Sequence, residues 1–245
     1  MVERVKTGIG GLDELIEGGL PGGSCVLVSG SPGTGKTIFG LQFLVTGAMN
    51  DEPGIYTTFE ESREDLINQA QGFNWDLEKL EEENRIKINS VDPKDLKQTL
   101  EKIEKEKEEI NAKRLVIDSL STIGIYATSF VSPESIEIEA IMDEKVEITR
   151  PIIGEAFTRR AVHYVIKRIK GLGLTTIMTS ELAKESDYLS RDTVSEFACD
   201  GVIKLVVMEG MGKRTLTIEK LRSTKHEIIP VNMEIADNGI VVKLE

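Results

Sequence analysis

The chain has 245 residues, of which 40% are hydrophobic and 29% charged, and its formal net charge is −12. This length suits one large α/β domain or two small ones. The acidic balance disfavours broad non-specific nucleic-acid binding, which depends on neutralising phosphates with Lys and Arg. The chain has no apolar run of the ~18 residues that a membrane-spanning helix needs and no signal-peptide pattern at its start, so we expect a cytoplasmic protein with no membrane contact. Two cysteines are too few for a disulfide framework.

A glycine-rich motif lies between an apolar β-like segment at 25–29 and a helical pattern at 36–49. It fits G-x-x-x-x-G-K-[ST], the phosphate-binding loop, whose glycines let the backbone wrap closely around phosphate oxygens. We expect Lys36 to reach the β- and γ-phosphates of ATP and the Thr37 hydroxyl to complete the shell of a Mg²⁺ ion. The predicted nucleotide contacts are the loop residues and the one after them: Gly30, Ser31, Pro32, Gly33, Thr34, Gly35, Lys36, Thr37 and Ile38.

Two adjacent carboxylates, Glu60 and Glu61, end the next β-like segment at 55–59. ATP hydrolysis needs a group that orients the attacking water opposite the leaving group, and a glutamate at this strand end suits that task. The alternative is that both carboxylates stabilise the N-terminus of a helix at 62–71 through its dipole. That helix is predicted to begin at Ser62, which has an acid three positions later. The residues alone leave both interpretations open.

A second carboxylate site is predicted at Asp118. The segments that precede it are a short β-like stretch at 86–88 and a Lys- and Glu-rich helix at 94–112, which we interpret as a solvated surface helix, with a partner-binding coiled coil as the alternative. The apolar strand at 115–118 then ends in Asp118, as in a Walker B motif that holds Mg²⁺, usually through water. Many buried strands also end in Asp at a turn. The segment 124–156 shows no clean period, which is typical of a functional or mobile loop.

The remaining elements complete an α/β pattern. A helix at 157–170 carries cations on one face, which we interpret as a solvated face or a bridge to the acidic surface of the next subunit. The alternative is that it lies near a pore that holds DNA. Strands follow at 175–179 and 202–207, and after residue 209 the pattern changes to antiparallel hairpins at 214–221, 231–235 and 240–244. Alternating strands and helices predict a mostly parallel central sheet flanked by helices, in a single domain, with C-terminal antiparallel hairpins.

Lys220 and Arg222 lie two residues apart and therefore share one face of the 214–221 strand and its end. Two cations on one face suit charge stabilisation of a transferring γ-phosphate. The alternative is an edge strand protected by Lys and Arg.

These motifs resemble the KaiC-type members of the RecA superfamily of ATPases over nearly the whole chain. The residues that carry the resemblance are Thr7-Gly8-Ile9-Gly10-Gly11-Leu12-Asp13 with Gly18-Gly19-Leu20-Pro21, Phe59-Glu60-Glu61-Ser62, Phe73-Asn74-Trp75-Asp76-Leu77, and Lys220-Leu221-Arg222 with His226. The resemblance implies a RecA-like fold and makes Glu60, with Glu61, the water-activating group. It also implies that Lys220, Arg222 and His226 reach the ATP of a neighbouring subunit, in a ring that is usually a hexamer. The end of the 175–179 strand, Thr179 or Ser180, is by the same resemblance a γ-phosphate sensor.

The chain also departs from the resemblance. It has one ATPase domain where circadian KaiC proteins have two, so circadian function is not inferred. Ser190, Thr193 and Ser195 only vaguely match the autophosphorylated stretch, which leaves autokinase activity unsupported. We therefore expect Mg²⁺-dependent ATP hydrolysis by a ring with a regulatory or signalling role and an unidentified protein partner. The alternative is a recombinase paralogue that acts on DNA.

Overall fold

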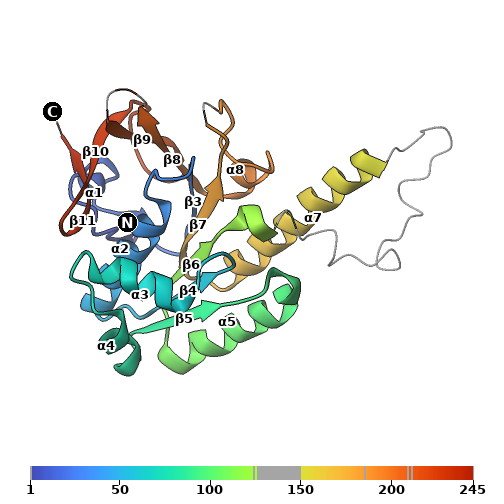
Figure 1. The fold of residues 1–245 in the computed structure, drawn as a ribbon, viewed down its shortest axis with the longest axis horizontal. Helices are drawn as coiled ribbons and strands as arrows, with labels where there is room; N and C mark the ends of the chain where they lie inside the picture. The colour runs from blue at the N-terminus through green and yellow to red at the C-terminus, as the bar shows by residue number, and fades with distance from the viewer. Residues whose placement is uncertain are drawn as a thin grey trace.

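A computed structural model describes residues 2–123, 125, 150–184, 186–208, 210 and 212–244, with the backbone alone at 95 and 150–157. Within these residues the main sheet has nine strands in the order β11-β10-β9-β8-β3-β7-β6-β4-β5 (Figure 1). The strand bounds are β3 Cys25–Gly30, β4 Gly54–Thr58, β5 Ile86–Ser90, β6 Arg114–Asp118, β7 Thr175–Glu181, β8 Gly201–Met208, β9 Lys213–Leu221, β10 Val231–Ala236 and β11 Gly239–Lys243.

The sheet is parallel from β8 through β5 and antiparallel from β8 to β11. This confirms the α/β fold class with C-terminal antiparallel strands. A separate two-stranded sheet pairs β1 (Arg4–Val5) with β2 (Leu20–Pro21). The helices are α1 Leu12–Leu15, α2 Lys36–Met49, α3 Arg63–Gln71, α4 Leu77–Glu82, the 3₁₀ turn η1 Pro93–Asp95, α5 Leu96–Ile110, α7 Arg150–Gly171 and α8 Ser195–Ala198.

Two hydrophobic cores cover the two faces of the sheet. Successive side chains of a strand point to opposite faces, so Val26 and Val28 of β3 enter one core, while Cys25 and Leu27 enter the other. The first core packs against α2, α3 and α4, and the second against α5 and α7. Because β3 lies between β7 and β8 and is buried along its whole length, its end is held from both sides.

Arg114 is an unusual core residue, with a side chain only 1% exposed. Its guanidinium donates to the Phe43 carbonyl at 2.6 Å and the Lys6 carbonyl at 2.9 Å, and pairs with Glu52. A buried guanidinium is tolerated when its donors are satisfied. Arg114 thus joins β6, α2 and the N-terminal segment.

The expected helix ends are largely found. α3 begins where predicted, because the Ser62 side chain accepts from the Asp65 N–H and Asp65 returns the bond in a capping box. α7 begins at Arg150, so the backbone is already helical in the last residues of the segment expected to be irregular, 124–156. The rest of that segment, 124 and 126–149, lies outside the described residues.

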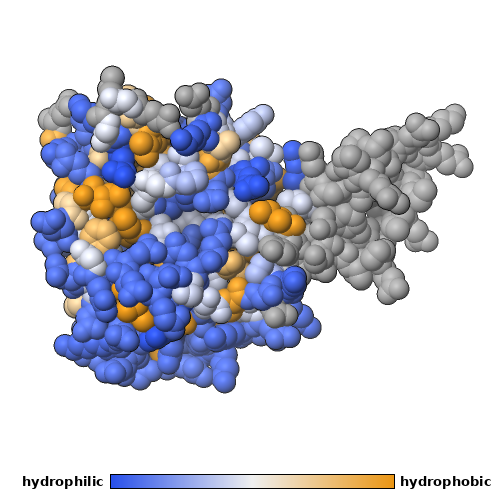
Figure 2. All heavy atoms as spheres, viewed as in Figure 1, coloured by the Kyte–Doolittle hydropathy of each residue, from blue (hydrophilic) through white to orange (hydrophobic). Residues whose placement is uncertain are grey.

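On the face of the molecule in Figure 2, hydrophilic residues predominate and apolar residues form separate patches. Among the described residues no helix has both the length and the apolar content to pass through a bilayer.

Candidate active site

The carboxyl ends of β3, β4, β6 and β7 meet at one edge of the sheet. The register pairs Thr58 with Asp118 and Gly30 with Glu181, so the ends of these strands are level with one another. In open α/β sheets this edge is where ligands bind. The predicted phosphate loop therefore lies beside the predicted carboxylates.

The phosphate loop has the backbone shape that its glycines permit. Gly33 and Gly35 have φ values of 79° and 103°, in the left-handed region that glycine adopts without strain. Gly35 precedes α2, whose N-terminus has no side-chain cap. The first N–H groups of α2, from Lys36 to Ile38, are therefore available to an anion, and the helix dipole favours negative charge there.

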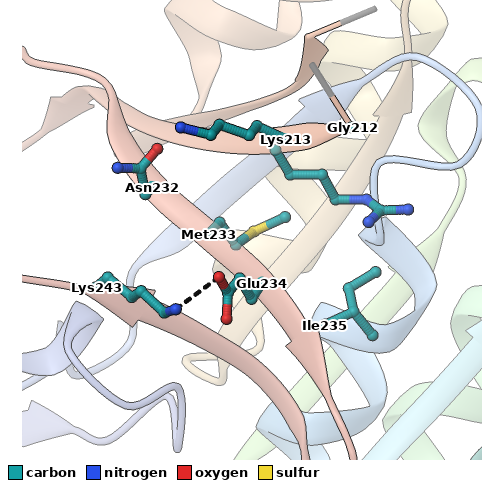
Figure 3. A pocket seen from close by; sticks show the side chains of 8 residues that line it. Gly212, Lys213, Asn232, Met233, Glu234, Ile235 and Lys243 are labelled. Carbon is teal, nitrogen blue, oxygen red and sulfur yellow. Dashed lines mark ion pairs between the residues drawn. The ribbon is translucent and has the colours of Figure 1, made fainter. Parts of the chain in front are cut away.

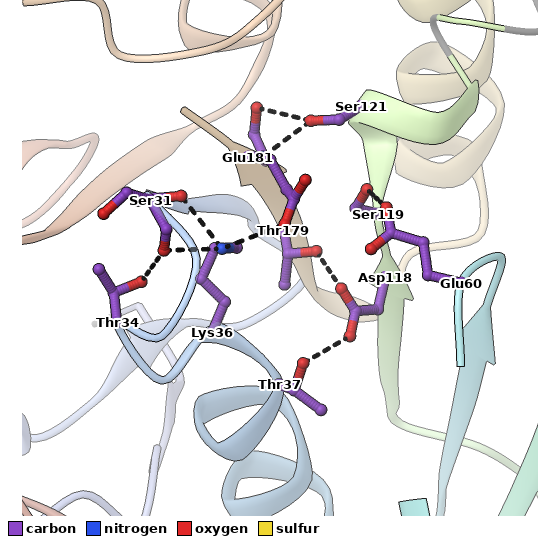
Figure 4. A network of polar contacts seen from close by, with 12 residues as sticks. Ser31, Thr34, Lys36, Thr37, Glu60, Asp118, Ser119, Ser121, Thr179 and Glu181 are labelled. Atoms are coloured by element: carbon purple, nitrogen blue, oxygen red, sulfur yellow. Dashed lines mark hydrogen bonds and ion pairs between the residues drawn. The ribbon is translucent and has the colours of Figure 1, made fainter. Parts of the chain in front are cut away.

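Lys36 is folded back over the loop (Figure 4). Its Nζ donates to the Gly30 carbonyl at 3.0 Å and the Ser31 carbonyl at 3.2 Å, and lies 3.8 Å from Glu181 Oε1. Burial lowers the pKa of Lys36, against the opposing effect of nearby carboxylates, Glu181 first among them. The ammonium group thus lies at the loop, where phosphate oxygens of a bound nucleotide would replace the carbonyl oxygens as its partners.

Asp118 lies at the centre of a buried hydroxyl cluster, part of which is drawn in Figure 4. Its carboxylate accepts from Thr37 Oγ1 at 3.2 Å, from the Tyr56 hydroxyl at 2.7 Å and from Thr179 Oγ1 at 2.5 Å. Burial, and then the Asp118 charge, raises the pKa of Tyr56 well above its ordinary value, so the phenol remains a donor. No sequence motif had singled out Tyr56, which reads as an ordinary aromatic residue of a buried strand.

The two adjacent glutamates point to different partners. Glu60 Oε1 accepts from Ser119 Oγ at 2.5 Å and from Thr122, both just beyond β6, and the residue is exposed. Glu61 accepts from Gln69 of α3 at 2.6 Å, and burial raises its pKa. The side-chain cap of α3 comes from neither, because Ser62 and Asp65 form it. Glu60 is therefore the glutamate that faces the end of β6.

The residues around Asp118 suit Mg²⁺. The hydroxyl of Thr37 and the carboxylate of Asp118 are hard oxygen donors already in contact. Among the described residues no group of three or more His, Cys, Asp or Glu is arranged to hold a metal. Mg²⁺ bound with a nucleotide needs no such cage, because it keeps several waters and takes phosphate oxygens as ligands.

Lys220, Arg222 and His226 lie away from this edge. Lys220 Nζ donates to the Glu196 carbonyl at 2.8 Å and the Cys199 carbonyl at 2.7 Å, and Arg222 pairs with Asp200 at 3.1 Å. The ring nitrogen Nδ1 of His226 is 3.1 Å from the Thr224 carbonyl. The register joins Gly30 to Leu205 and Leu216, and Val26 to Gly201 and Leu221. At about 3.3 Å per residue, β9 runs roughly 16 Å from the level of the phosphate loop to Leu221.

The serines considered for phosphorylation are enclosed. Ser190 and Ser195 are both fully buried, and their hydroxyls donate to Glu196 and Asp192. Of the two residues expected at the end of β7, Thr179 contacts Asp118, whereas Ser180 lies 3.4 Å from Ser121.

A cavity of about 500 Å³ borders the phosphate loop on the side of the hairpins (Figure 3). Arg214 belongs to its lining and donates to the Gly33 carbonyl at 3.3 Å. Glu234 and Lys243, which also line it, form an ion pair of 2.6 Å between the neighbouring strands β10 and β11. No sequence motif had indicated this hollow, because its walls come from β9, β10 and β11 together.

A central strand that feeds a glycine-rich loop and a helix, with an aspartate at the end of a nearby strand, defines the class of P-loop nucleotide-binding proteins with a RecA-type sheet. The comparisons then identify the family. A family model described as "ATPase: KaiC" matches residues 5–156 and 134–245. The chain therefore belongs to the KaiC family of ATPases, which supports ATP binding and hydrolysis as its general activity.

Relatives of two lengths match. The circadian clock oscillator protein KaiC of Synechococcus elongatus is 36% identical over 253 residues, which cover 98% of this chain and 44% of the relative. The chain thus spans less than half the length of such relatives. The UPF0273 protein of Thermotoga maritima is 32% identical over 262 residues, covering 99% of this chain and 96% of that protein. The crystal structure of a KaiC-like protein from Pyrococcus horikoshii has a TM-score of 0.81 and 38% identity, with 100% of both chains covered.

Proposed function

We propose that the chain binds Mg-ATP at residues 30–38 and hydrolyses it to ADP and inorganic phosphate. The observation that carries this proposal is the convergence of Lys36, the Thr37–Asp118 pair and Glu60 at one edge of the sheet. Lys36 exchanges its carbonyl contacts for the β- and γ-phosphates. Thr37 and Asp118 would hold Mg²⁺, which would supply positive charge to neutralise the phosphate oxygens.

Glu60 is the proposed water-activating residue. Ser119 and Thr122 donate to its carboxylate and so hold it beside the end of β6. Glu60 orients a water molecule for in-line attack on the γ-phosphorus and accepts its proton, while the bond from that phosphorus to the β,γ-bridging oxygen breaks. Glu61, bonded to α3, holds the turn that carries Glu60.

Lys220, Arg222 and His226 are proposed to complete the site of a neighbouring subunit. Their separation from the phosphate loop of the same chain supports this, because side chains at one end of β9 do not reach a phosphate at the other. A site shared in this head-to-tail manner closes into a ring, and we propose the hexamer of the family. The acidic chain and the enclosed Ser190 and Ser195 support a nucleotide-dependent regulatory ring rather than an autokinase.

DNA binding is not proposed as a second function. The cations on the outer face of α7 are partly engaged: Arg168 pairs with Glu104, Arg159 donates to Thr193, and Lys170 pairs with Asp200. These contacts within the chain are the reason that DNA binding by α7 is not proposed.

Phosphate release tests the proposal, with four proteins compared: wild type, Lys36→Ala, Glu60→Gln and the control Glu82→Gln, an exposed residue of α4. We expect Lys36→Ala to lose ATP binding. Glu60→Gln should bind ATP but turn over about 10²–10⁴-fold more slowly, as for loss of a general base. Glu82→Gln should match the wild type. Unchanged turnover in both site variants would refute the assignment.

A further inference from the structure

We call Lys220, Arg222 and His226, which are proposed to reach the ATP of a neighbouring subunit, the finger residues. Asp200 joins one of them, Arg222, to the centre of the sheet. It lies between α8 and β8, next to the first residue of β3. Its Oδ1 accepts from Lys170 Nζ at 2.7 Å and from Arg222 Nη1 at 3.1 Å, and its Oδ2 accepts from the Cys25 N–H at 3.1 Å. The Arg222 N–H also donates to the Asp200 carbonyl at 2.9 Å. Arg222 is therefore bound to Asp200 through both its backbone and its side chain.

The charge and burial of Asp200 suit a residue that holds the Arg222 side chain in place. The Asp200 side chain is 20% exposed, whereas that of Arg222 is 54% exposed. Burial acts to raise the pKa of Asp200, but hydrogen bonds from Lys170, the Cys25 N–H and Arg222 outweigh it and leave the pKa below its ordinary value. The carboxylate is thus ionised at neutral pH. Lys170 shares its Oδ1 with Arg222, and the Cys25 N–H holds its Oδ2.

Lys220 is held by the same short segment. Its ammonium group binds the carbonyls of Glu196 and Cys199, at the carboxyl end of α8, where a helix attracts cations. Burial, and then the charge of Arg222, lowers the pKa of Lys220. The two cations therefore lie close enough to repel each other, and residues 196–200 offset that repulsion.

The contact with Asp200 leaves Arg222 with N–H groups that can bind a phosphate. A guanidinium carries five N–H donors in a planar fork, and within the described residues its ion pair with Asp200 uses Nη1. The other donors remain for a phosphate. Ordering a free arginine side chain costs conformational entropy, and a pre-formed ion pair removes part of that cost before a neighbour's nucleotide binds.

We propose that Asp200 is the positioning residue of the trans-acting finger, holding Arg222 in the orientation that reaches the triphosphate bound by the next subunit. This inference rests on the proposed function. Because Asp200 is bonded to Cys25, the support is the first residue of β3, a strand that is buried along its whole length. A finger on such a rigid base is placed more reproducibly than one on a free turn.

Asp200→Asn tests the role by ATP turnover. Asparagine retains the shape and an oxygen for the Cys25 N–H but loses the charge that holds both cations. We expect kcat to fall about 10–100-fold, as for a misplaced catalytic group, with little change in KM for ATP. Asp200→Glu should recover part of kcat, and Arg222→Ala sets the maximum loss. The control Asp51→Asn, at a side chain 90% exposed, should leave turnover unchanged.

Mixed oligomers show whether Asp200→Asn impairs the site of the neighbouring subunit, as the proposal requires, or the site of its own subunit. Glu60→Gln subunits should hydrolyse ATP only very slowly but carry intact finger residues. When they are mixed with Asp200→Asn subunits, turnover should exceed the sum of the two separate proteins, because Asp200→Asn sites then receive an intact finger. A mixture of Glu60→Gln with Arg222→Ala should show the same gain.

The outcomes are distinguishable. If turnover rises in the mixture of Glu60→Gln with Arg222→Ala but not in that with Asp200→Asn, the role of Asp200 is overturned and the shared site stands. No gain in either mixture overturns the trans finger and Asp200 with it. Turnover raised by Asp200→Asn alone shows that Asp200 restrains Arg222, which also overturns the proposal. If wild type and Lys36→Ala release phosphate equally, the proposed function itself fails.

Discussion

At the scale of single residues, the site depends on one buried carboxylate that collects hydroxyl groups from separate elements. Thr37 comes from α2, Tyr56 from β4 and Thr179 from β7, and all three donate to Asp118. Of these donors, Tyr56 is enclosed completely by the first core. Its hydroxyl has a charged partner and no access to water, so this bond should be worth more than an ordinary surface hydrogen bond.

Tyr56→Phe removes that hydroxyl and little else. Because the lost bond goes to a charged group, we expect the free energy of unfolding to fall by about 2 kcal/mol. Urea denaturation of the two proteins measures this difference. Tyr164→Phe is the matched control, because that ring is 53% exposed, and its effect should stay within about 0.5 kcal/mol. Equal stability of Tyr56→Phe and wild type would contradict the importance of this bond.

The sequence allowed the charged residues of the site and Thr37 to be predicted, but not the hydroxyl groups of Tyr56 and Thr122. Lys36, Thr37 and Asp118 belong to motifs whose spacing follows from phosphate and Mg²⁺ geometry. Tyr56 and Thr122 reach the site from a strand and a helical segment, at positions that the local sequence pattern does not distinguish from ordinary packing. The roles of Glu60, Lys220 and Arg222 remain predictions.

At the scale of elements, α3 fixes the turn that carries both glutamates. Only the N-cap residue Ser62 separates Glu61 from Arg63, the first residue of the helix. Gln69, in the last turn of the helix, donates to Glu61. The capping box of Ser62 and Asp65 satisfies N–H groups that the helix itself leaves unpaired. The cap thus stabilises the helix and the start of the glutamate turn together.

Ser62→Ala should lower the free energy of unfolding by about 1 kcal/mol, as for loss of an N-cap. Ser62→Thr keeps a hydroxyl at the same place and should retain most of the stability. Chemical denaturation of both variants gives the comparison. A threonine variant as unstable as the alanine variant would mean that the cap is not the cause.

The predicted strands and long helices are found in the structure. Each is long enough for its buried face to leave a regular spacing of apolar residues in the sequence. The short elements were not predicted: β1, β2, α1, α4 and α8. α1 and α8 have four residues each and β1 and β2 two, too few for a period to be recognised. Tertiary contacts hold them instead, as when Arg4 of β1 donates to Thr224 and to the Ser223 carbonyl.

At the scale of the whole molecule, the phosphate loop and the proposed fingers lie at different levels of one sheet. The pairings Gly30–Leu205 and Val26–Gly201 mark the two levels, and β9 connects them. If Lys220, Arg222 and His226 act on a neighbour's ATP as proposed, a single chain carries two separate half-sites. Two chains bring complementary halves together only in a head-to-tail arrangement, which continues until a ring closes.

ATP should therefore stabilise the assembly, because the nucleotide lies between chains. Anything that binds the assembled form more tightly than the monomer shifts the equilibrium toward assembly. We expect mass photometry with Mg-ATP to show a multiple of the monomer mass, and we expect Arg222→Ala to require a higher protein concentration for the same assembly. Lys36→Ala should not respond to ATP. Arg168→Ala, which removes an exposed arginine of α7, serves as the control for loss of positive charge.

The comparison of Arg222→Ala with Arg168→Ala decides between a shared site and general electrostatics. The chain carries a net charge of −12, so removal of any arginine increases repulsion between subunits. If repulsion governs assembly, both variants should weaken it equally, and added salt should restore both, because salt screens exposed charges. If Arg222 binds the neighbour's nucleotide, its loss should weaken assembly more in ATP than without nucleotide. A protein that stays monomeric with and without ATP would contradict the shared site altogether.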